Sequence, residues 1–152
     1  MQYHFGPRLR SLHWCTEQML SKALAELELT GSQGRIIGYI ARAKTAPCAR
    51  DIEEYFGLTH PTVSGILSRL EKKEFLEFRP DALDRRCKRI YLLPKGEECH
   101  AAIVGSIREM EQQLVADFSP QEQADFSALL DRAIRNMGGS PCCHRSKEEY
   151  KA

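Results

Sequence analysis

The sequence predicts a mainly helical fold that contains one small β-hairpin. Six segments carry apolar residues at the three- and four-residue intervals of an amphipathic helix. Residues 76–79 and 89–93 instead alternate apolar and polar side chains, as half-buried strands do, on either side of a run of turn residues. A length of 152 residues suits a single domain with a real core. Helices on both sides of one hairpin therefore favour a single domain of the mainly α class.

Composition and charge narrow the possible partners and locations. The net charge is +1, so a nucleic-acid site has to be a local basic patch, because the field of the whole chain is weak. No apolar run approaches the roughly 20 residues that a membrane span requires. The first residues, Met1 to Arg8, lack the apolar stretch of a signal peptide. We therefore expect a cytoplasmic protein without a membrane partner.

The cysteines and the short motifs do not indicate an enzyme. Six cysteines, at positions 15, 48, 87, 99, 142 and 143, form no C-x-x-C pair, so we expect mostly free thiols in a reducing compartment. The sequence has no phosphate-binding glycine loop, no H-E-x-x-H pattern and no nucleophile elbow. We expect no catalytic residues and no cofactor.

The first two predicted helices are joined by a capping box. The first runs from about Leu9 to Leu29 and carries an apolar side made of Leu9, Leu12, Met19, Leu20, Ala23, Leu24 and Leu27. In the capping box, Thr30 and Gln33 satisfy each other's free amides at the start of the second helix. The second helix turns Ile36, Ile37, Ile40 and Ala41 inward and fades near residues 45–47.

The next two helices form a helix-turn-helix pattern. A short helix from about Ala49 to Phe56 turns Ile52, Tyr55 and Phe56 inward. Gly57 suits the left-handed residue that ends it, and two residues later Thr59 can cap the following helix. Two short helices joined by three residues that include a glycine are typical of this motif.

The second of these helices has two distinct faces. Pro61 lies in its first turn, where proline is tolerated, and its apolar stripe is Val63, Ile66, Leu67 and Leu70. The opposite face carries Thr62, Ser64, Gly65, Ser68 and Arg69. Small polar side chains let a helix backbone approach base edges in a major groove. An ordinary amphipathic surface helix is the alternative if the segment is considered alone.

A charged hairpin follows the helix-turn-helix. Leu76 and Phe78 lie on one strand, Ile90 and Leu92 on the other, and residues 80–84 break the alternation. The tip holds Asp84, Arg85, Arg86, Lys88 and Arg89 around Cys87. A solvated charged turn is the simple interpretation. Directly after a helix-turn-helix, the same hairpin favours a wing whose arginines reach phosphates or a minor groove.

Two further helices complete the prediction. One runs from Pro94 to about Phe118, with an apolar stripe made of Cys99, Ala102, Ile103, Ile107, Met110 and Leu114. A second capping box with proline at its first position, residues 119–122, begins the last helix. Its stripe is Phe126, Leu129, Leu130, Ala133, Ile134 and Met137. Gly138 and Gly139 stop this helix, and residues 138–152 are expected to form a flexible tail.

This order of elements, with the motifs that it carries, resembles the MarR family of bacterial transcriptional regulators. The resemblance depends on Pro61-Thr62-Val63-Ser64 and Ser68-Arg69-Leu70-Glu71-Lys72-Lys73, on Asp84-Arg85-Arg86, which matches the family's D-x-R, and on Lys95-Gly96. Two positions depart from the family: Glu74 stands where a glycine is usual, and Leu93 where a threonine cap is usual. If the backbone at Glu74 is left-handed, the side chain there costs on the order of 1 kcal/mol.

The resemblance implies a winged helix-turn-helix regulator that acts as an obligate homodimer. Residues 1–137 would be a single winged-helix unit, with a DNA-binding core at 30–93 and dimerisation helices at about 5–29 and 94–137. Their long apolar stripes, more than one small core can cover, agree with dimerisation. The dimer would be a repressor that binds a pseudo-palindromic operator of double-stranded DNA through successive major grooves. The alternative is a winged-helix protein-interaction module that does not bind DNA, which the basic hairpin tip argues against.

The resemblance also implies roles for the polar residues of the helix-turn-helix and wing. Thr62, Ser64, Gly65 and Ser68 would enter the groove, and Arg69 would contact phosphate. Arg86 would enter the minor groove, held by a charge-assisted pair with Asp84. Arg85 and Lys88 are further phosphate candidates.

Family members often respond to a small aromatic or phenolic effector, or to oxidation of a cysteine. For an effector pocket the sequence offers His13, Trp14 and Tyr39, with packing in a core or interface as the alternative. For oxidation it offers Cys15, with a buried structural thiol as the alternative. The tail residues Cys142, Cys143 and His144 could hold a soft metal, although short motifs of this kind usually have no function, and we expect no metal site.

Overall fold

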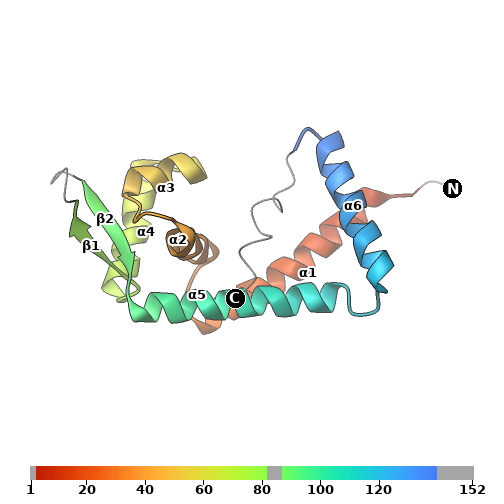
Figure 1. Ribbon diagram of the computed structural model, residues 1–152, viewed down its shortest axis with the longest axis horizontal. Coiled ribbons are helices and arrows are strands. Elements are labelled where there is room, and N and C mark those ends of the chain that lie inside the picture. The colour runs from red at the N-terminus through yellow and green to blue at the C-terminus, as the bar shows by residue number, and fades with distance from the viewer. Residues whose placement is uncertain (1–2, 82–86, 140–152) are drawn as a thin grey trace. The chain divides into compact units, whose positions relative to one another are not determined.

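The computed structural model describes residues 3–81 and 87–139, which form six helices and one two-stranded hairpin (Figure 1). The predicted mainly α class with a small hairpin is confirmed. The chain divides into two compact units, Met1–Ile107 and Arg108–Ala152, and the boundary falls within one helix, α5. Among the described residues, no helix is both long enough and apolar enough to cross a membrane.

The first unit begins with a helix that is longer at its start than the sequence predicts. Helix α1 spans Phe5–Glu26, whereas the apolar stripe indicates a start near Leu9. Pro7 lies in its first turn, where a missing amide hydrogen leaves no helical bond unmade. After the helix, Glu28 takes a left-handed backbone (φ 55°), and the amide of Leu29 donates to the carbonyl of Leu24 at 2.9 Å. This turn ends α1 and directs the chain into α2.

The core lies between α2, α3, α4 and the hairpin. Helix α2 spans Gly31–Arg42, α3 Ala49–Phe56 and α4 His60–Lys72, while strands β1 and β2 span Leu76–Pro80 and Lys88–Leu92. The largest fully buried side chains are those of Ile36, Ile37, Ile52, Val63, Leu67, Leu70, Leu76 and Ile90. The predicted apolar stripe of α4 is buried throughout. Two side chains predicted to face inward do not: Ala41 is exposed, and Tyr55 is 49% exposed.

The turn between α3 and α4 is close to the predicted one but is capped differently. Gly57 is left-handed (φ 63°), as expected, and the amide of Leu58 donates to the carbonyl of Glu53 at 3.1 Å. Thr59 is the N-cap residue of α4, yet its side chain caps no amide. Its hydroxyl lies 2.9 Å from the hydroxyl of Thr62 instead, so the predicted cap bond is wrong although its position is right.

The hairpin is held to the helix-turn-helix by backbone and side-chain contacts. Strands β1 and β2 pair antiparallel, with Phe78 opposite Ile90. The amide of Ile90 donates to the carbonyl of Pro47 at 2.8 Å, which ties β2 to the segment before α3. The guanidinium of Arg89 donates to the carbonyl of Ala46 at 3.2 Å. These bonds fix β2 beside the start of α3.

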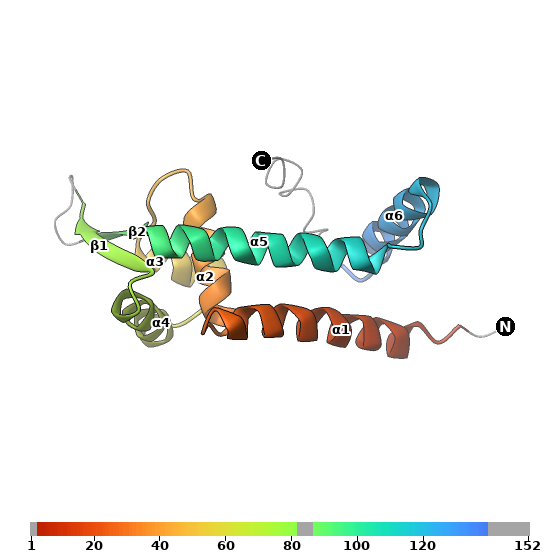
Figure 2. The same cartoon turned by 90° about the horizontal axis from the view of Figure 1, so that it is seen from below.

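Side-chain hydrogen bonds join the end of α4 to the turn after α1 and to the start of α5, and Figure 2 shows these three helices. The ammonium group of Lys73 donates to the carbonyl of Glu28 at 2.7 Å, and that of Lys95 donates to the carbonyl of Lys73 at 2.9 Å. Lys95 also lies 4.7 Å from the centre of the Phe75 ring. Glu74 is left-handed (φ 62°), so the strain anticipated from the sequence is present.

Helix α5 spans Pro94–Leu114 and ends four residues before the predicted Phe118, since residues 115–117 form a turn. In the second unit, α6 spans Pro120–Asn136. The predicted capping box is confirmed: the amide of Ser119 donates to Oε2 of Glu122 at 2.8 Å, and the amide of Glu122 donates to the Ser119 hydroxyl at 3.3 Å. The expected tail is described only at Gly138 and Gly139, because residues 140–152 lie outside the described part of the chain.

Candidate nucleic-acid interface

The polar face of α4 is turned to solvent. Thr62, Ser64, Ser68 and Arg69 are exposed, and Gly65 is half-buried. A methyl group added at Gly65 would meet no atom within 4 Å. Because the opposite stripe of α4 is anchored in the core, this face is presented on a fixed support. It is therefore free to contact another molecule.

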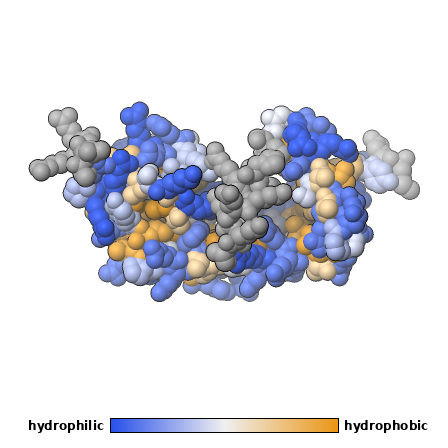
Figure 3. Space-filling view, in the orientation of Figure 1, coloured by the Kyte–Doolittle hydropathy of each residue, from blue (hydrophilic) through white to orange (hydrophobic). Residues whose placement is uncertain are grey.

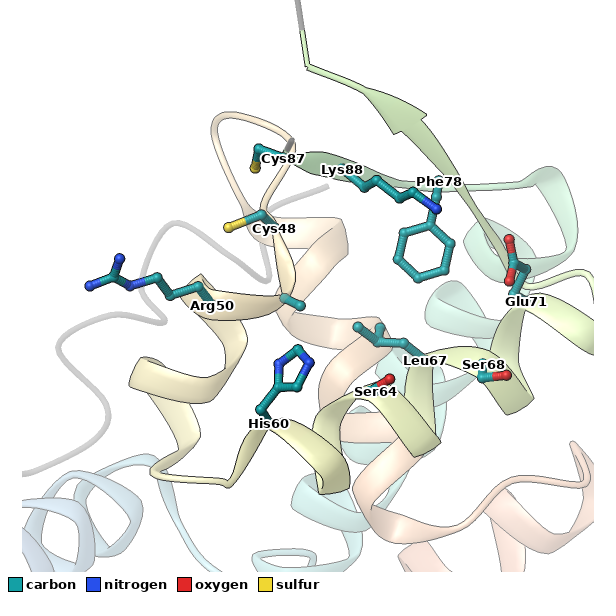
Figure 4. A pocket seen from close by; sticks show the side chains of 11 residues that line it. Cys48, Arg50, His60, Ser64, Leu67, Ser68, Glu71, Phe78, Cys87 and Lys88 are labelled. Carbon is teal, nitrogen blue, oxygen red and sulfur yellow. The ribbon is translucent and has the colours of Figure 1, made fainter. Parts of the chain in front are cut away.

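A hollow of about 520 Å³ lies between α3, α4 and the hairpin (Figure 4). Its lining residues are Cys48, Ala49, Arg50, His60, Ser64, Leu67, Ser68, Glu71, Phe78, Cys87 and Lys88. Ser64 and Ser68 come from α4, and Lys88 reaches in from the hairpin (Figure 4). The structure thus brings three of the sequence-predicted DNA-facing residues to one hollow. Thr62, Gly65 and Arg69 belong to the same helix but do not line it.

Two side chains that line this hollow, those of Arg50 and His60, were missed by the sequence analysis. Arg50, in the first turn of α3, pairs with Glu54 at 2.9 Å, and this hydrogen-bonded carboxylate raises the pKa of the guanidinium. His60, at the start of α4, has Nδ1 2.6 Å from Oε1 of Glu53. The i,i+4 spacing of Arg50 and Glu54 indicates a solvent-facing pair. Nothing in that spacing shows that Arg50 lines a hollow together with residues of the hairpin.

Arg89, on strand β2, is held by carboxylates within the fold. Nε of Arg89 donates to Oδ2 of Asp81 at 2.5 Å, and its Nη1 lies 3.8 Å from Oδ2 of Asp51. The hydrogen bond to Asp81 raises the pKa of Arg89. Lys88 next to it is exposed. The predicted wing residues Asp84, Arg85 and Arg86 lie outside the described residues.

The three residues offered for an effector pocket do not form one cluster in the described chain. Trp14 is 64% exposed on α1, and His13 beside it is also exposed. Tyr39 is half-buried, and its ring centre lies 4.6 Å from that of Tyr55 and 5.8 Å from that of Phe56. Burial, followed by the nearby charge of Asp51, raises the pKa of Tyr39.

The cysteine singled out for oxidation, Cys15, is exposed on α1, while Cys99 is buried in the core. Residues 3–81 and 87–139 contain no group of three His, Cys, Asp or Glu side chains that could hold a metal ion. The metal candidates Cys142, Cys143 and His144 lie outside the described residues.

The chain is similar to known transcription regulators in both sequence and structure. A family model described as MarR family matches residues 20–86. The uncharacterized HTH-type transcriptional regulator YsmB of Bacillus subtilis (strain 168) is 32% identical over 76 residues, and YwaE of the same organism is 27% identical over 88 residues. These matches cover 50% and 58% of this chain, which spans about half, 52%, of the length of each relative.

Solved structures extend the similarity over most of the chain. MepR, a transcription regulator of the Staphylococcus aureus multidrug efflux pump MepA, is 28% identical with a TM-score of 0.79, over 89% of this chain and 99% of MepR. The S. aureus MepR–DNA complex is 29% identical with a TM-score of 0.73 over the same shares. MepR bound to ethidium bromide is 29% identical with a TM-score of 0.69, over 89% of this chain and 97% of MepR. Together with the family model and the helix-turn-helix and hairpin described above, these matches show that the chain belongs to the MarR family of winged-helix transcriptional regulators.

Proposed function

We propose that this chain is a sequence-specific DNA-binding regulator that acts as a homodimer and represses transcription. The observation that carries the proposal is the solvent-facing polar side of α4, with Ser64 and Ser68 in the hollow beside Lys88. Similarity to MepR in complex with DNA, over 89% of this chain, supports it. A cytoplasmic location, where bacterial chromosomal DNA lies, is part of the proposal.

The chemistry of α4 suits close approach to a duplex. Gly65 leaves the backbone uncovered at the middle of the exposed face, and the neighbouring hydroxyls can both donate and accept hydrogen bonds. Arg69 and Lys88 would bind phosphates, and phosphate contacts fix the register of a protein on DNA. Short hydroxyl side chains make few bidentate base contacts, so DNA shape and the arginines Arg85 and Arg86 of the wing would supply much of the specificity.

A second copy of the chain would cover the outer helices. Helix α1 has no buried residue, and Leu9 and Trp14 on it are 55% and 64% exposed. In the second unit, α6 also has no buried residue, and Leu129 and Met137 are 53% and 88% exposed. Apolar side chains appear among hydrophilic ones over α6 (Figure 3). Exposed apolar surface of this extent is typical of an interface. A symmetric dimer would present two α4 helices to a pseudo-palindromic operator.

Release of DNA by a small ligand or an oxidant completes the proposal. Support comes from MepR, which binds ethidium bromide. His13, Trp14 and Tyr39 remain candidates for an effector contact, and Cys15 for oxidation. His13 and Trp14 belong to α1, the helix that the second copy would cover in a dimer.

A methyl group at Gly65 tests the assigned face. Gly65→Ala adds no clash within the chain and removes a flexible residue from a helix, so its stability should rise by about 0.5–1 kcal/mol. Its affinity for the DNA upstream of its own gene, measured by fluorescence anisotropy, should nevertheless fall, because the methyl group would occupy the space of a base edge. Unchanged affinity would show that α4 does not enter the groove by this face.

Charge variants test the wing and the DNA binding itself. Arg86→Ala should weaken operator binding strongly and reduce the slope of log affinity against log salt by about 1, without changing dimer mass or thermal stability. Arg8→Ala is the control for the loss of an arginine outside the helix-turn-helix and wing, since Arg8 is exposed on α1 and, within the described part of the chain, donates to the carbonyl of His4. Binding of wild-type protein no tighter to its upstream DNA than to unrelated DNA would refute the proposed function.

A further inference from the structure

Two thiols meet at one wall of the hollow beside α4. Cys48 is the residue before α3, and Cys87 is the residue before β2. Both are half-buried, both line the hollow, and Figure 4 labels them on the side away from Glu71. In Figure 4 the two side chains lie near each other at the same end of the hollow, and the neighbouring Cys48 side chain contributes to a raised pKa of Cys87. The fold therefore brings together two cysteines that are far apart in the sequence.

The backbone around this pair is held in place on both sides. Pro47, adjacent to Cys48, accepts the amide of Ile90 at 2.8 Å, three residues after Cys87. The amide of Cys48 donates to Oδ2 of Asp51 at 2.8 Å, and the carbonyl of Cys87 accepts the amide of Asp81 at 3.0 Å. These bonds hold the main chain on both sides of the pair, and the Cys48 side chain also faces the amide of Asp51 in the capping box of α3. The proximity of the thiols is thus built into the way β2 joins the start of α3.

We infer that Cys48 and Cys87 form a reversible disulfide when the protein meets a peroxide. One thiolate attacks a peroxide oxygen, which gives a sulfenic acid and, after protonation, releases the first water molecule from hydrogen peroxide. The second thiol attacks the sulfenic sulfur, so that the S–S bond forms and the second water leaves. Two thiols lose two electrons, and one hydrogen peroxide becomes two waters. A dithiol reductant returns both cysteines by thiol–disulfide exchange.

The environment of the pair predicts how its reaction depends on pH. Burial, followed by the neighbouring Cys48 side chain, raises the pKa of the Cys87 thiol. Because the thiolate is the reactive form, oxidation should be slow at neutral pH and faster in mildly alkaline solution. This behaviour distinguishes the pair from an activated thiol that reacts at once with trace peroxide.

Disulfide formation would change the surface that faces DNA. An S–S bond is about 2.05 Å long, shorter than any contact between two sulfur atoms that are not bonded, so the start of β2 and the start of α3 have to move together. Because Lys88 directly follows Cys87, it would move with it, and the hollow between this part of the hairpin and α4 would narrow. We expect the oxidised protein to bind its operator more weakly, because the disulfide would tie the base of the wing to α3. This expectation rests on the proposed function.

Peptide mapping tests the disulfide without any reference to DNA. The full-length protein is treated with hydrogen peroxide at pH 8.5, alkylated and digested without reduction. The expected result is a peptide pair joined through Cys48 and Cys87, in a chain that still runs as a monomer on a non-reducing denaturing gel. Cys48→Ser and Cys87→Ser should lose the pair, whereas the matched variant Cys15→Ser should keep it. Absence of the linked peptide, or joining of either cysteine mainly to position 142 or 143, would overturn the inference.

DNA affinity then tests the consequence separately. Reduced wild-type protein must first bind its upstream DNA, and a failure at this stage counts against the proposed function while the mapping result still stands. Oxidised wild-type protein should bind on the order of 10-fold more weakly, within the usual range of coupling between two sites. Dithiothreitol should restore binding, and peroxide should not affect Cys48→Ser. Equal affinity of the reduced and disulfide-linked forms would overturn the effect on DNA.

Discussion

Replacement of Gly96 by alanine should destabilise the protein more than any propensity argument suggests. Gly96 is buried near the start of α5. A Cβ atom there would lie 2.2 Å from the carbonyl oxygen of Phe75 and 3.2 Å from Cδ2 of Leu92. The leucine can rotate away, but the carbonyl is part of the backbone and also accepts the amide of Leu93 at 3.0 Å. The new methyl group therefore forces α5 away from the end of α4.

The magnitude follows from three contributions. Overpacking of a filled site costs typically about 1–3 kcal/mol. Weakening of the Leu93–Phe75 hydrogen bond adds roughly 1 kcal/mol. The better helix propensity of alanine returns about 0.5–1 kcal/mol. The expected net loss is about 2 kcal/mol in the free energy of unfolding.

Urea unfolding followed by circular dichroism, at one fixed protein concentration, measures this loss. The matched control is Gly105→Ala in the same helix, where an added Cβ meets no atom within 4 Å. The control should be stabilised by about 0.5–1 kcal/mol, so the two variants should move in opposite directions. If Gly96→Ala stays within about 0.5 kcal/mol of wild type, the normal range for a harmless surface change, the close approach of α5 to Phe75 is refuted.

Two further substitutions probe strain and protonation. Glu74→Gly should raise the free energy of unfolding by about 1 kcal/mol, because glycine adopts the left-handed backbone (φ 62°) without penalty, whereas Glu74→Ala should not; equal stability of the two variants in thermal melts would contradict this. Burial and, less strongly, the charge of Arg42 lower the pKa of His100 below 6.5, so the unfolded chain binds a proton that the folded chain resists. The stability contribution of neutral His100 is therefore complete above pH 6.5 and is lost as the pH falls below that value. His100→Gln should lose less stability than wild type between pH 6.5 and 5. Parallel curves of unfolding free energy against pH for the two proteins would contradict this assignment.

Local features of this chain could be predicted because they depend on residues close in sequence. The Thr30–Gln33 capping box needs only two side chains three positions apart, and both of its bonds are present. The left-handed Gly57 follows from the lack of a side chain at a helix end. The buried stripe of α4 follows from helical periodicity. In each case the determining interaction lies within one turn or one helix.

Predictions failed where the determining contact lies elsewhere. The start of α1 at Phe5 carries no apolar stripe, because this turn packs on no core, so periodicity gave no signal there. The hydroxyl of Thr59 could bond to an amide or to Thr62, and sequence alone favours neither. Tyr55 has the spacing of an inward residue, yet its ring packs against Tyr39 near the surface. These choices depend on neighbours from other elements.

The candidate site shows the same division. The polar face of α4 is visible in the sequence, because one helix contains it. The hollow also needs α3 and the hairpin, which meet through the hydrogen bond between Ile90 and Pro47. Arg50 and the thiol pair Cys48–Cys87 border the hollow only for that reason. No spacing rule links positions that are joined only by long-range bonds such as Ile90 to Pro47 and Arg89 to Ala46, so the sequence analysis named Cys15 as the candidate for oxidation instead.

The strained residue Glu74 lies where the rest of the fold is most firmly joined. Lys95 bonds to the carbonyl of Lys73 immediately before it, and Gly96 allows α5 to approach Phe75 immediately after it. Lysines at a helix C-terminus also interact favourably with its dipole. A strained backbone conformation that costs on the order of 1–3 kcal/mol persists only where the surrounding structure holds it in place. The contacts of Lys95 and Gly96 hold residue 74 in this way. The end of α4 is therefore fixed by its contacts with α5 and by the hydrogen bond from Lys73 to the carbonyl of Glu28. The backbone preference of residue 74 itself does not fix it. For this reason Glu74→Gly should change stability and leave the orientation of α4, and with it DNA affinity, unaltered.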